Sequence, residues 1–401
     1  MALAQTPYCS AFQAEVRGAA PKLVIVTELI APYRIPVFNA LAQRKELDLH
    51  VIFLSETDPT RRQWHVYKNE IEFDYEVLPF SRWRFGKYHA LMNRGMLKAL
   101  NRINPDLILC GGYNYLASWQ TAIWAKSHGV PILLWTESTA NDQRNERALI
   151  EFLKTRFSRL CDGFVVPGTA SAHYLKNRGV ADDRIFHAPN AVDIDLFSRL
   201  AQESRTREDE LRAELALPPR YFLYVGRFVK EKGLFDLLQA YAQQDFHLRN
   251  EVGLVLVGDG VDRVELMRQA SRIKPGTIRF AGFVQREGLP ALYAFADALI
   301  LPTHSDTWGL VVNEAMACAL PVIVTNVAGC ARDLVKDGWN GFIVPPADSA
   351  RLSSAMARLA ADSKLRRQMS VRSQQIIQAY SPATWSEGIV NTVSAMRQRI
   401  T

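Results

Sequence analysis

The sequence has 401 residues, of which 48% are hydrophobic, and it carries a formal net charge of +7. This length accommodates two domains with separate cores, and the hydrophobic content excludes an intrinsically disordered chain. No apolar run approaches the roughly 20 residues that a membrane-spanning helix needs, and the sequence contains no recognisable nucleic-acid-binding module.

The sequence has five cysteines, an odd number: Cys9, Cys110, Cys161, Cys318 and Cys330. They are not closely paired, and most of them fall in apolar segments that should be buried. This pattern is typical of a reducing compartment and argues against a metal site. Residues 1–20 contain neither a basic leader nor a long apolar segment. We therefore expect a cytoplasmic protein.

The first half alternates apolar strands with amphipathic helices, a pattern that predicts a parallel sheet covered on both faces. Helices are expected over residues 34–45 and 145–161. Strands are expected over residues 22–27, 48–54, 106–110, 131–135 and 163–167.

Two loops of this half carry candidate binding residues. The loop after the first strand offers Tyr33 and Arg34 as candidate binding residues, although Arg34 is alternatively a helix-start residue without a ligand. The loop after the strand PILLW offers Glu137. A carboxylate there can accept a hydrogen bond from a hydroxyl or orient an arginine, for which Arg144 and Arg147 are candidates.

Residues 80–102 contain six Lys/Arg and no acidic residue, with Trp83, Phe85 and Tyr88 interleaved among the cations. We expect a basic, aromatic loop that leads into a helix and contacts an anionic membrane surface or a lipid diphosphate. The alternative is a solvated helix face with a few core aromatics.

The second half repeats the alternation after the charged segment 193–219, which is expected to form a linker helix and hinge. A last helix is expected at about 383–399. Strands are expected at 221–226, 253–258, 277–283, 297–302, 321–325 and 341–346.

The first of these strands ends in Gly226 and Arg227, and Lys232 opens the helix that follows. An arginine can donate two parallel hydrogen bonds to phosphate oxygens, and a lysine acts as a point charge. Because glycine lets a ligand approach the backbone closely, this group suits a phosphate-bearing ligand.

A second motif places Asp306 and Glu314 on either side of a helix start. The backbone N–H groups of Gly309, Leu310 and Val311 lie between them, where unpaired donors and the helix dipole favour an anion. Taken alone, Asp306 is a helix cap and Glu314 a solvated residue. Together with the cations upstream, the motif indicates a diphosphate site.

The segments GRFVKEKG (226–233) and DTWGLVVNEAMACALPVIVT (306–325), in this order, resemble the retaining glycosyltransferases of family 4. The resemblance implies the α/β GT-B fold, in which two Rossmann-like doubly wound domains face each other across a cleft. Residues 21–195 would form the acceptor-binding domain and residues 196–382 the nucleotide-sugar-binding domain. The helix at about 383–399 would pack back on the first.

The resemblance also implies the roles of the motif residues. Arg227 and Lys232 hold the donor diphosphate, Asp306 faces the donor sugar in place of the family's first glutamate, and Glu314 binds the ribose hydroxyls. Aspartate is shorter by one methylene, which changes its reach by about 1.5 Å. Further donor contacts are expected from Gly226, Gly258, Phe283, Val284, Trp308, Gly309, Leu310 and Val311, with Phe283 alternatively a core residue.

By resemblance, the chain is expected to transfer a hexosyl unit, with retention, from a UDP- or GDP-sugar to a glycan or lipid-linked acceptor. Cofactors and metal ions are not expected, and the setting is cell-surface polysaccharide or glycolipid biosynthesis. Asp306, and Glu137 where relatives have a histidine, leave alternatives open. These are a sugar-nucleotide-binding protein with lost or altered activity, a GT-B epimerase, or an inverting transferase. The turn at Asn190 is expected to shape the cleft without taking part in chemistry.

Overall fold

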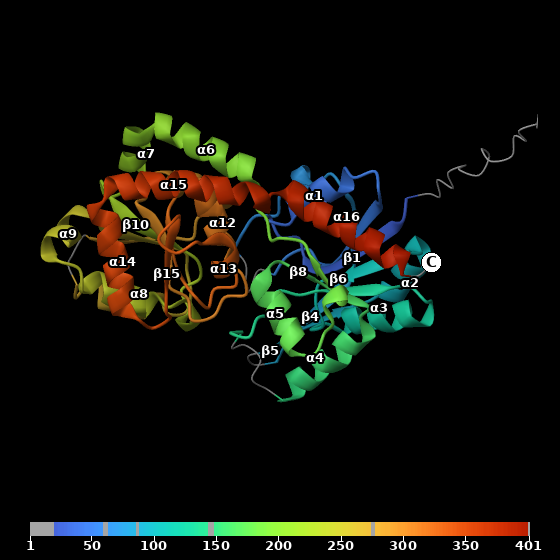
Figure 1. Cartoon of the computed structure of the whole chain (residues 1–401). Coiled ribbons are helices and arrows are strands. Elements are labelled where there is room, and N and C mark those ends of the chain that lie inside the picture. The colour runs from blue at the N-terminus through green and yellow to red at the C-terminus, as the bar shows by residue number, and fades with distance from the viewer. Residues whose placement is uncertain (1–19, 59–62, 86–87, 143–147, 274–276, 400–401) are drawn as a thin grey trace, which may run out of the picture.

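The computed structural model describes residues 20–58, 63–85, 88–142, 148–273 and 277–399. This part of the chain folds into two α/β domains that lie next to each other (Figure 1). Each domain is built on one parallel sheet with helices on both faces. The expected fold class, two Rossmann-like units, is confirmed.

The N-terminal sheet has the strand order β3-β2-β1-β6-β7-β8-β9. Its strands are β1 (Lys22–Leu29), β2 (Asp48–Ser55), β3 (Asp74–Val77), β6 (Leu107–Cys110), β7 (Ile132–Trp135), β8 (Gly163–Val166) and β9 (Ile185–His187). All five strands predicted in this half are present. The two edge strands, β3 and β9, were not predicted, because both are short and only partly buried, so they lack a continuous apolar run.

Helices cover both faces of this sheet. On one face, α1 (Ile35–Ala42) and α16 (Pro382–Gln398) share a core with alternate residues of the strands. On the other face lie α2 (Met96–Ile103), α3 (Leu116–Ser127), α4 (Ala148–Leu160) and α5 (Thr169–Asn177). The strands are therefore apolar on both sides, which explains their continuous hydrophobic runs.

The C-terminal sheet has the strand order β12-β11-β10-β13-β14-β15. Its strands are β10 (Tyr221–Val225), β11 (Gly253–Val257), β12 (Ile278–Gly282), β13 (Ala298–Leu301), β14 (Val322–Thr325) and β15 (Gly341–Val344), and all six were predicted. The strands are all parallel, but the order in which successive strands are added to the sheet changes direction between β10 and β13. In open α/β sheets, ligands bind beyond the carboxyl ends of the strands at such a switch point.

Two helical layers enclose this sheet. One layer contains α8 (Leu234–Ala242), α10 (Arg263–Ala270) and α14 (Ser349–Ala361), with α9 (Phe246–Glu251) nearby. The other contains α6 (Ile194–Thr206), α11 (Leu289–Ala294), α12 (Leu310–Ala317) and α13 (Ala331–Leu334). The remaining helices are α7 (Glu208–Glu214) and α15 (Ser363–Ile377).

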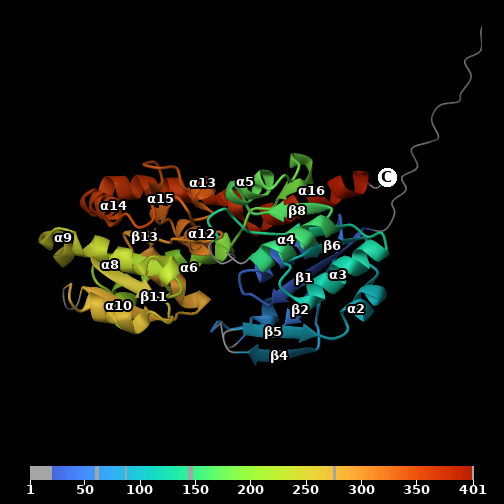
Figure 2. The same cartoon turned by 90° about the horizontal axis from the view of Figure 1, so that it is seen from below.

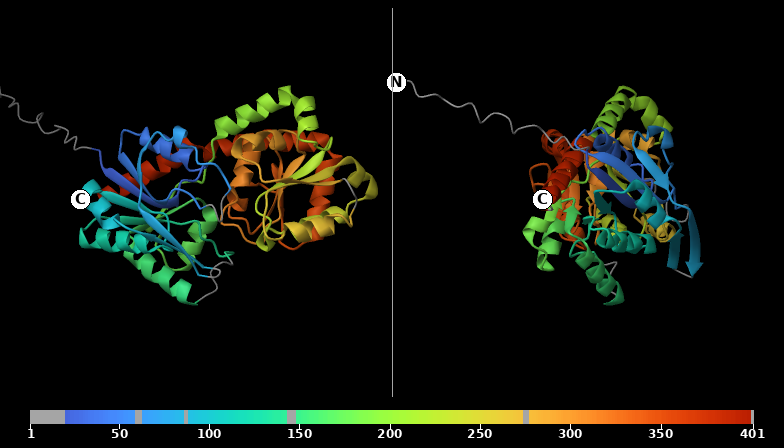
Figure 3. Two further views of the ribbon diagram at one scale, coloured as in Figure 1. Left: turned by 180° about the vertical axis from the view of Figure 1, so that it is seen from behind. Right: turned by 90° about the vertical axis from the view of Figure 1, so that its right-hand side faces the viewer.

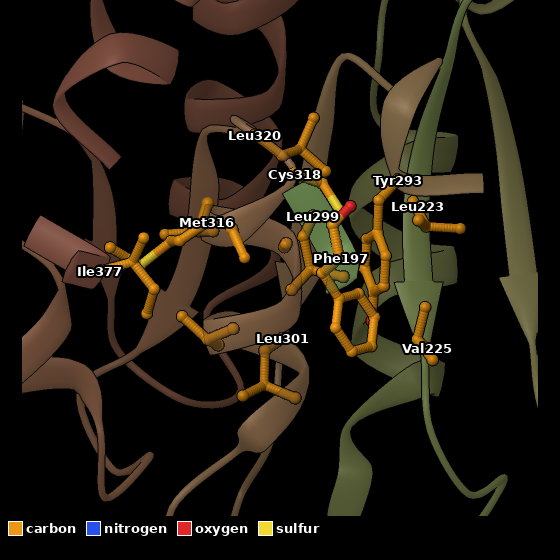
Figure 4. Close-up of a cluster of buried hydrophobic side chains, with 14 of the residues drawn as sticks. Phe197, Leu223, Val225, Tyr293, Leu299, Leu301, Met316, Cys318, Leu320 and Ile377 are labelled. Carbon is orange, nitrogen blue, oxygen red and sulfur yellow. The ribbon is translucent and has the colours of Figure 1, made fainter. Parts of the chain in front are cut away.

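The segment expected to be a linker helix forms α6 and α7, which lie on the outer surface of the C-terminal domain (Figure 3). Phe197 of α6 packs against Tyr293 of α11, with 6.3 Å between the ring centroids. Figure 4 shows both rings in one buried cluster with Leu223, Leu299 and neighbouring apolar side chains. This packing anchors α6, the first helix after the chain leaves the N-terminal domain, to the core of the C-terminal domain.

The end of the chain crosses back between the domains. The helices α15 and α16 follow one another along one side of the molecule, from the C-terminal to the N-terminal domain (Figure 1). Trp385 of α16 is fully buried, and its ring centroid lies 5.4 Å from that of Trp135. A Cβ atom at Gly388 would lie 2.4 Å from the His187 carbonyl oxygen, so glycine lets α16 approach β9.

The expectation of a loop at residues 80–93 is wrong. This part of the basic segment forms an antiparallel hairpin of β4 (Phe80–Phe85) and β5 (Tyr88–Asn93), which is separate from both parallel sheets (Figure 2). Arg82 forms an ion pair with Asp58 and donates a 3.1 Å hydrogen bond to the Ser55 hydroxyl, which fastens one face of the hairpin to the end of β2. Asp58 and Ser55, which both precede the segment in sequence, therefore help to hold the hairpin in place. The composition of residues 80–102 alone could not reveal these partners.

Candidate active site

A cavity of about 420 Å³ opens beyond the carboxyl ends of β10 and β13, at the switch point of the C-terminal sheet. Its lining is charged: Arg227, Lys230, Glu231, Lys232, His304, Ser305, Asp306 and Thr307. The structure therefore brings Arg227, Lys232 and Asp306 together from two motifs that are far apart in sequence. The sequence had predicted this group.

Lys232 and Asp306 form the central ion pair of this cavity. The Lys232 Nζ lies 2.5 Å from Asp306 Oδ2, and the two side chains are 14% and 16% exposed. Asp306 also accepts a hydrogen bond of 3.3 Å from the Trp308 backbone N–H, which fixes the direction of the carboxylate. The shorter aspartate is thus held against the lysine at the floor of the cavity.

Glycines bring the surrounding backbone together. At Gly233, φ is 68° and a Cβ atom would lie 1.9 Å from the Pro302 carbonyl oxygen, so no other residue fits beside Lys232. Gly226 and Gly258 follow β10 and β11, and a Cβ atom at Gly258 would lie 1.9 Å from the Gly226 carbonyl oxygen. These two glycines therefore permit close contact between two loops, which is a structural role.

Arg227 lies on the rim of the cavity and is 53% exposed. Its nearest acid is Glu231, with 3.4 Å between Nη2 and Oε1. Because the pair is exposed and loose, its stabilising energy is small and Arg227 can turn toward an anion.

Gly309 immediately precedes the helix α12, and its φ of 99° favours a residue without a side chain. No side chain caps this helix. The N–H groups of Leu310 and Val311 lie in the first turn, where an α-helix provides no internal partner. The helix start thus presents unpaired donors, as predicted, although these residues do not line the cavity around Lys232.

Glu314 is half-buried on α12 and accepts a hydrogen bond of 2.7 Å from the Tyr293 hydroxyl. Burial raises the pKa of Glu314 to about 7, and the bond from Tyr293 opposes this shift. A neutral and a charged form therefore coexist near neutral pH. Like the α12 amides, Glu314 lies outside the lining of the Lys232 cavity.

Trp308 does not fit the donor-contact role that was expected of it. The ring is 2% exposed, and its Nε1 donates a hydrogen bond of 2.9 Å to Asn313 Oδ1. Asn313 in turn donates to the Asn190 carbonyl oxygen, also at 2.9 Å. Trp308 therefore belongs to a buried contact between the domains. This role could not be predicted from sequence, because large aromatic residues occur in cores and in sites alike.

Phe283 and Val284 follow β12. Phe283 is 41% exposed, so the alternative that it is a core residue is wrong, and its ring is available to a ligand. Val284 is partly buried and packs against the core of the domain. Neither residue lines the cavity around Lys232.

On the N-terminal side, Arg34 and Glu137 form an ion pair, with 2.6 Å between Nη2 and Oε1. Asn190, which is fully buried, donates to the same Glu137 oxygen at 3.0 Å and accepts from Arg34 at 3.2 Å. Glu137 therefore orients an arginine, but that arginine is Arg34; Arg144 and Arg147 lie outside the described residues. Asn190 was expected only to shape the cleft and is a member of this network.

Two further residues join the site. Thr307 of the C-terminal domain lies 3.5 Å from Glu137 Oε2, which connects the network to the charged cavity. His304 lines that cavity and pairs with Asp236 of α8. The sequence signal for His304 was its place in the loop after the segment DALILP, two residues beyond the segment.

The two halves match two family models. Residues 207–376 match "Glycosyl transferases group 1", and residues 38–196 match "Glycosyltransferase Family 4". The chain belongs to the GT-B glycosyltransferases of family 4. The paired lysine and aspartate thus occupy the cleft of a GT-B protein.

Among curated relatives of this family 4 chain, alpha-D-kanosaminyltransferase of Streptomyces kanamyceticus is 25% identical over 63% of this chain and 67% of its own length. D-inositol 3-phosphate glycosyltransferase of Xylanimonas cellulosilytica is 32% identical over 45% of this chain, and the match spans only 44% of that relative. The fold resembles HepE of Anabaena in complex with UDP, with a TM-score of 0.74, 20% identity, and coverage of 93% of this chain and 100% of HepE.

Within the described ranges, no group of three or more His, Cys, Asp or Glu side chains is placed to hold a metal ion. None of the helices described combines the length and apolar character that crossing a bilayer requires. The four described cysteines, Cys110, Cys161, Cys318 and Cys330, are buried and unpaired with one another, whereas Cys9 lies outside the described part of the chain.

Proposed function

We propose that this protein is a retaining hexosyltransferase, which moves a hexosyl unit from a nucleotide diphosphate sugar to a glycan or lipid-linked acceptor. The observation that carries the proposal is the Lys232–Asp306 pair, which lies with Arg227 in one cavity at the switch point of the C-terminal sheet. Cations that suit a phosphate and a carboxylate that suits sugar hydroxyls therefore line the same cavity.

In this reaction, negative charge develops on the leaving diphosphate. Lys232 and Arg227 would stabilise that charge, and the free amides at the start of α12 would add further donors. Such preorganised donors are typically worth about 3–4 kcal/mol each, or roughly 10²–10³ in rate. Asp306, held beside Lys232, would accept hydrogen bonds from the transferred sugar.

The donor is proposed to be linked to UDP. HepE, which shares this fold, has been crystallised with UDP and with UDP-glucose, and a GDP-linked donor is the alternative. We propose transfer without a metal ion or cofactor, because Arg227 and Lys232 supply the positive charge that a metal would otherwise bring to the diphosphate.

We place the reaction in the cytoplasm, in cell-surface polysaccharide or glycolipid biosynthesis, with peripheral contact between segment 80–102 and an anionic membrane. Trp83 and Met92 are 57% and 46% exposed, and the strand register places them on the same outer face of the β4–β5 hairpin. Arg94 and Lys98 are exposed directly after it. Apolar side chains beside cations suit the interface of an anionic bilayer.

The test is a thermal-shift series with UDP, GDP and their glucose, galactose, mannose and N-acetylglucosamine conjugates, in the presence of EDTA. A ligand that binds only the folded state raises the Tm, so one nucleotide should raise it in the wild type and fail to do so in Arg227→Ala. The matched control, Arg268→Ala, removes an exposed arginine of α10 and should keep the shift.

With the donor identified, product analysis by NMR gives the anomeric configuration. Retention supports the proposal, and an inverted product or epimerised donor would replace it with one of the alternatives. The absence of a shift with every nucleotide would indicate a chain without donor binding, and a shift that requires a divalent ion would refute metal independence.

A further inference from the structure

A second cavity, of about 460 Å³, lies in the N-terminal domain beyond the carboxyl ends of β1, β6 and β7. Thr307 lines this cavity as well as the charged cavity around Lys232. The two cavities therefore meet at the Thr307 side of the interdomain cleft. A molecule in the second cavity would face a sugar held at Asp306.

Aromatic rings form much of the wall of the second cavity: Tyr33, Trp64, Tyr113 and Trp135. Tyr33 and Trp64 meet edge to face, with 6.0 Å between their centroids. Gly111 and Gly112, at the end of β6, add lining without side chains. Such rings present flat, electron-rich faces, which attract the partially positive C–H groups of a pyranose ring.

The charge of this cavity is predominantly negative. Among the described lining residues, Arg34 is the single cation, whereas Glu28, Glu137 and Asp142 are acids. Arg34 is already bound to Glu137 and Asn190, and its guanidinium lies 4.0 Å from the centroid of the Trp135 ring. The charges of Arg34 and Glu137 thus offset each other within the wall.

Glu28 differs from the other polar residues of this wall. It lies at the end of β1, is half-buried, and forms no hydrogen bond or ion pair with any residue that the structure describes. A half-buried carboxylate without a partner loses hydration and gains nothing in return, unless a ligand supplies hydrogen-bond donors. Sugar hydroxyls and ammonium groups are such donors, and phosphates and carboxylates are not.

We infer that the second cavity binds the terminal sugar of the acceptor and that this sugar is a pyranose without negative charge. Glu28 accepts hydrogen bonds from its hydroxyl or amino groups, and Tyr33 and Trp64 pack against its ring. Anionic sugars are excluded, because their charge would face the unpaired Glu28 carboxylate at short range in a partly buried site. This inference rests on the proposed transferase function, which it extends from the donor to the acceptor.

The test uses the full chain, the donor found in the melting series, and four p-nitrophenyl glycosides: glucoside, mannoside, glucosaminide and glucuronide. Saturation-transfer NMR measures binding of each sugar, and nucleotide release measures turnover. The uncharged and amino sugars should bind, and the glucuronide should bind at least tenfold more weakly. Glu28→Gln and Trp64→Ala should each lower kcat/KM for the acceptor by roughly tenfold or more, while the nucleotide-induced Tm shift stays unchanged.

Two variants serve as matched controls, and both should keep the acceptor kcat/KM. Glu46→Gln changes an exposed glutamate paired with Arg44, and Phe152→Ala removes an exposed aromatic residue of α4 that lines neither cavity. Glu28→Gln should also reduce the difference in binding affinity between the glucoside and the glucuronide. Binding of the glucuronide as tight as that of the glucoside, or no binding of any sugar to a chain that still binds its nucleotide, would overturn the inference. Failure of the nucleotide itself to bind would instead overturn the proposed function.

Discussion

Glu314 is the residue whose chemistry is most sensitive to its surroundings. Its carboxyl is buried against Tyr293, and this burial raises its pKa to about 7 from an ordinary value of 4.5. In the unfolded chain the group ionises near its ordinary value, so the folded state binds a proton more tightly. The stability contribution of this group is therefore greatest below pH about 4.5 and is lost as the pH rises through about 7.

Nucleotide binding is expected to show the opposite trend. If Glu314 binds the ribose hydroxyls, its charged form accepts their hydrogen bonds better, so the nucleotide lowers the pKa of Glu314 and releases a proton. The affinity should rise about tenfold between pH 6 and pH 8, which is the ionised fraction gained by a group with a pKa near 7. Isothermal titration calorimetry across this range measures the slope.

The variant Glu314→Gln keeps the shape of the side chain and removes its titration. It should flatten the pH dependence, apart from the contribution of the nucleotide's own phosphate, which both proteins share. Equal slopes in wild type and variant would show that Glu314 does not titrate on binding.

The residues of the charged cavity could be predicted from sequence, because each follows a recognisable strand. Arg227 and Asp306 lie on the loops that follow β10 and β13, and the carboxyl ends of neighbouring parallel strands meet at one edge of a sheet. The partners of Arg34 could not be predicted in this way. Glu137 and Asn190 are 103 and 156 residues away, on loops whose lengths and directions the strand pattern does not fix.

At the level of elements, the central strands were predicted and the peripheral ones were not. Central strands are apolar on both faces and stand out as continuous runs, whereas β3 carries Asp74 and Glu76 within four residues. The β4–β5 hairpin was also missed, because its alternating cations and aromatics resemble a solvated loop. In the structure, alternate residues of the hairpin lie on opposite faces. Arg82 and Leu91 lie on the inner face, which contacts the rest of the domain, and the other face is exposed.

This outer face leads to a prediction for membrane binding. Full burial of a large apolar side chain is worth about 1.5–3 kcal/mol, so Trp83→Ser combined with Met92→Ser should weaken binding to phosphatidylglycerol vesicles at least tenfold. Co-sedimentation measures the bound fraction. Binding of the wild type should also fall with added salt, because Arg94 and Lys98 attract the anionic surface.

The control is a double variant on the other domain, Phe246→Ser with Val264→Ser, which removes exposed apolar residues outside the hairpin. It should bind vesicles as the wild type does. Equal binding of the hairpin variant and the wild type, or no binding of the wild type, would contradict membrane contact through this face.

At the scale of the whole molecule, the domains meet along the cleft through polar contacts. Near the second cavity, Arg286 of the 3₁₀ turn η5 (Arg286–Gly288) forms a bidentate pair with Glu70, at 2.5 and 2.9 Å. Its guanidinium also lies over the Tyr67 ring, 4.1 Å from the centroid, and Tyr67 donates to Glu287 at 2.7 Å. These contacts fasten residues 63–70 of the first domain to the second.

Trp64, which lines the second cavity, belongs to this fastened segment. We therefore predict that the interdomain contact holds Trp64 in the wall of the cavity, and that the acceptor binding inferred above depends on this contact. Replacing Arg286 by alanine leaves Glu70 unpaired in a partly buried site, where the charge pair is screened less than on the surface. The segment should then detach, and Trp64 with it.

Arg286→Ala is accordingly expected to raise the acceptor KM by about tenfold while the Tm shift induced by the nucleotide stays the same. The pair Arg268–Glu265, which lies within α10 and is exposed, provides the matched control, and Arg268→Ala should leave the acceptor KM unchanged. A double-mutant cycle with Glu70→Ala measures the coupling, for which contacting residues typically give about 0.5–3 kcal/mol. If Arg286→Ala changes the acceptor KM no more than Arg268→Ala does, closure does not shape the acceptor cavity, and Trp64 is held by its own domain alone.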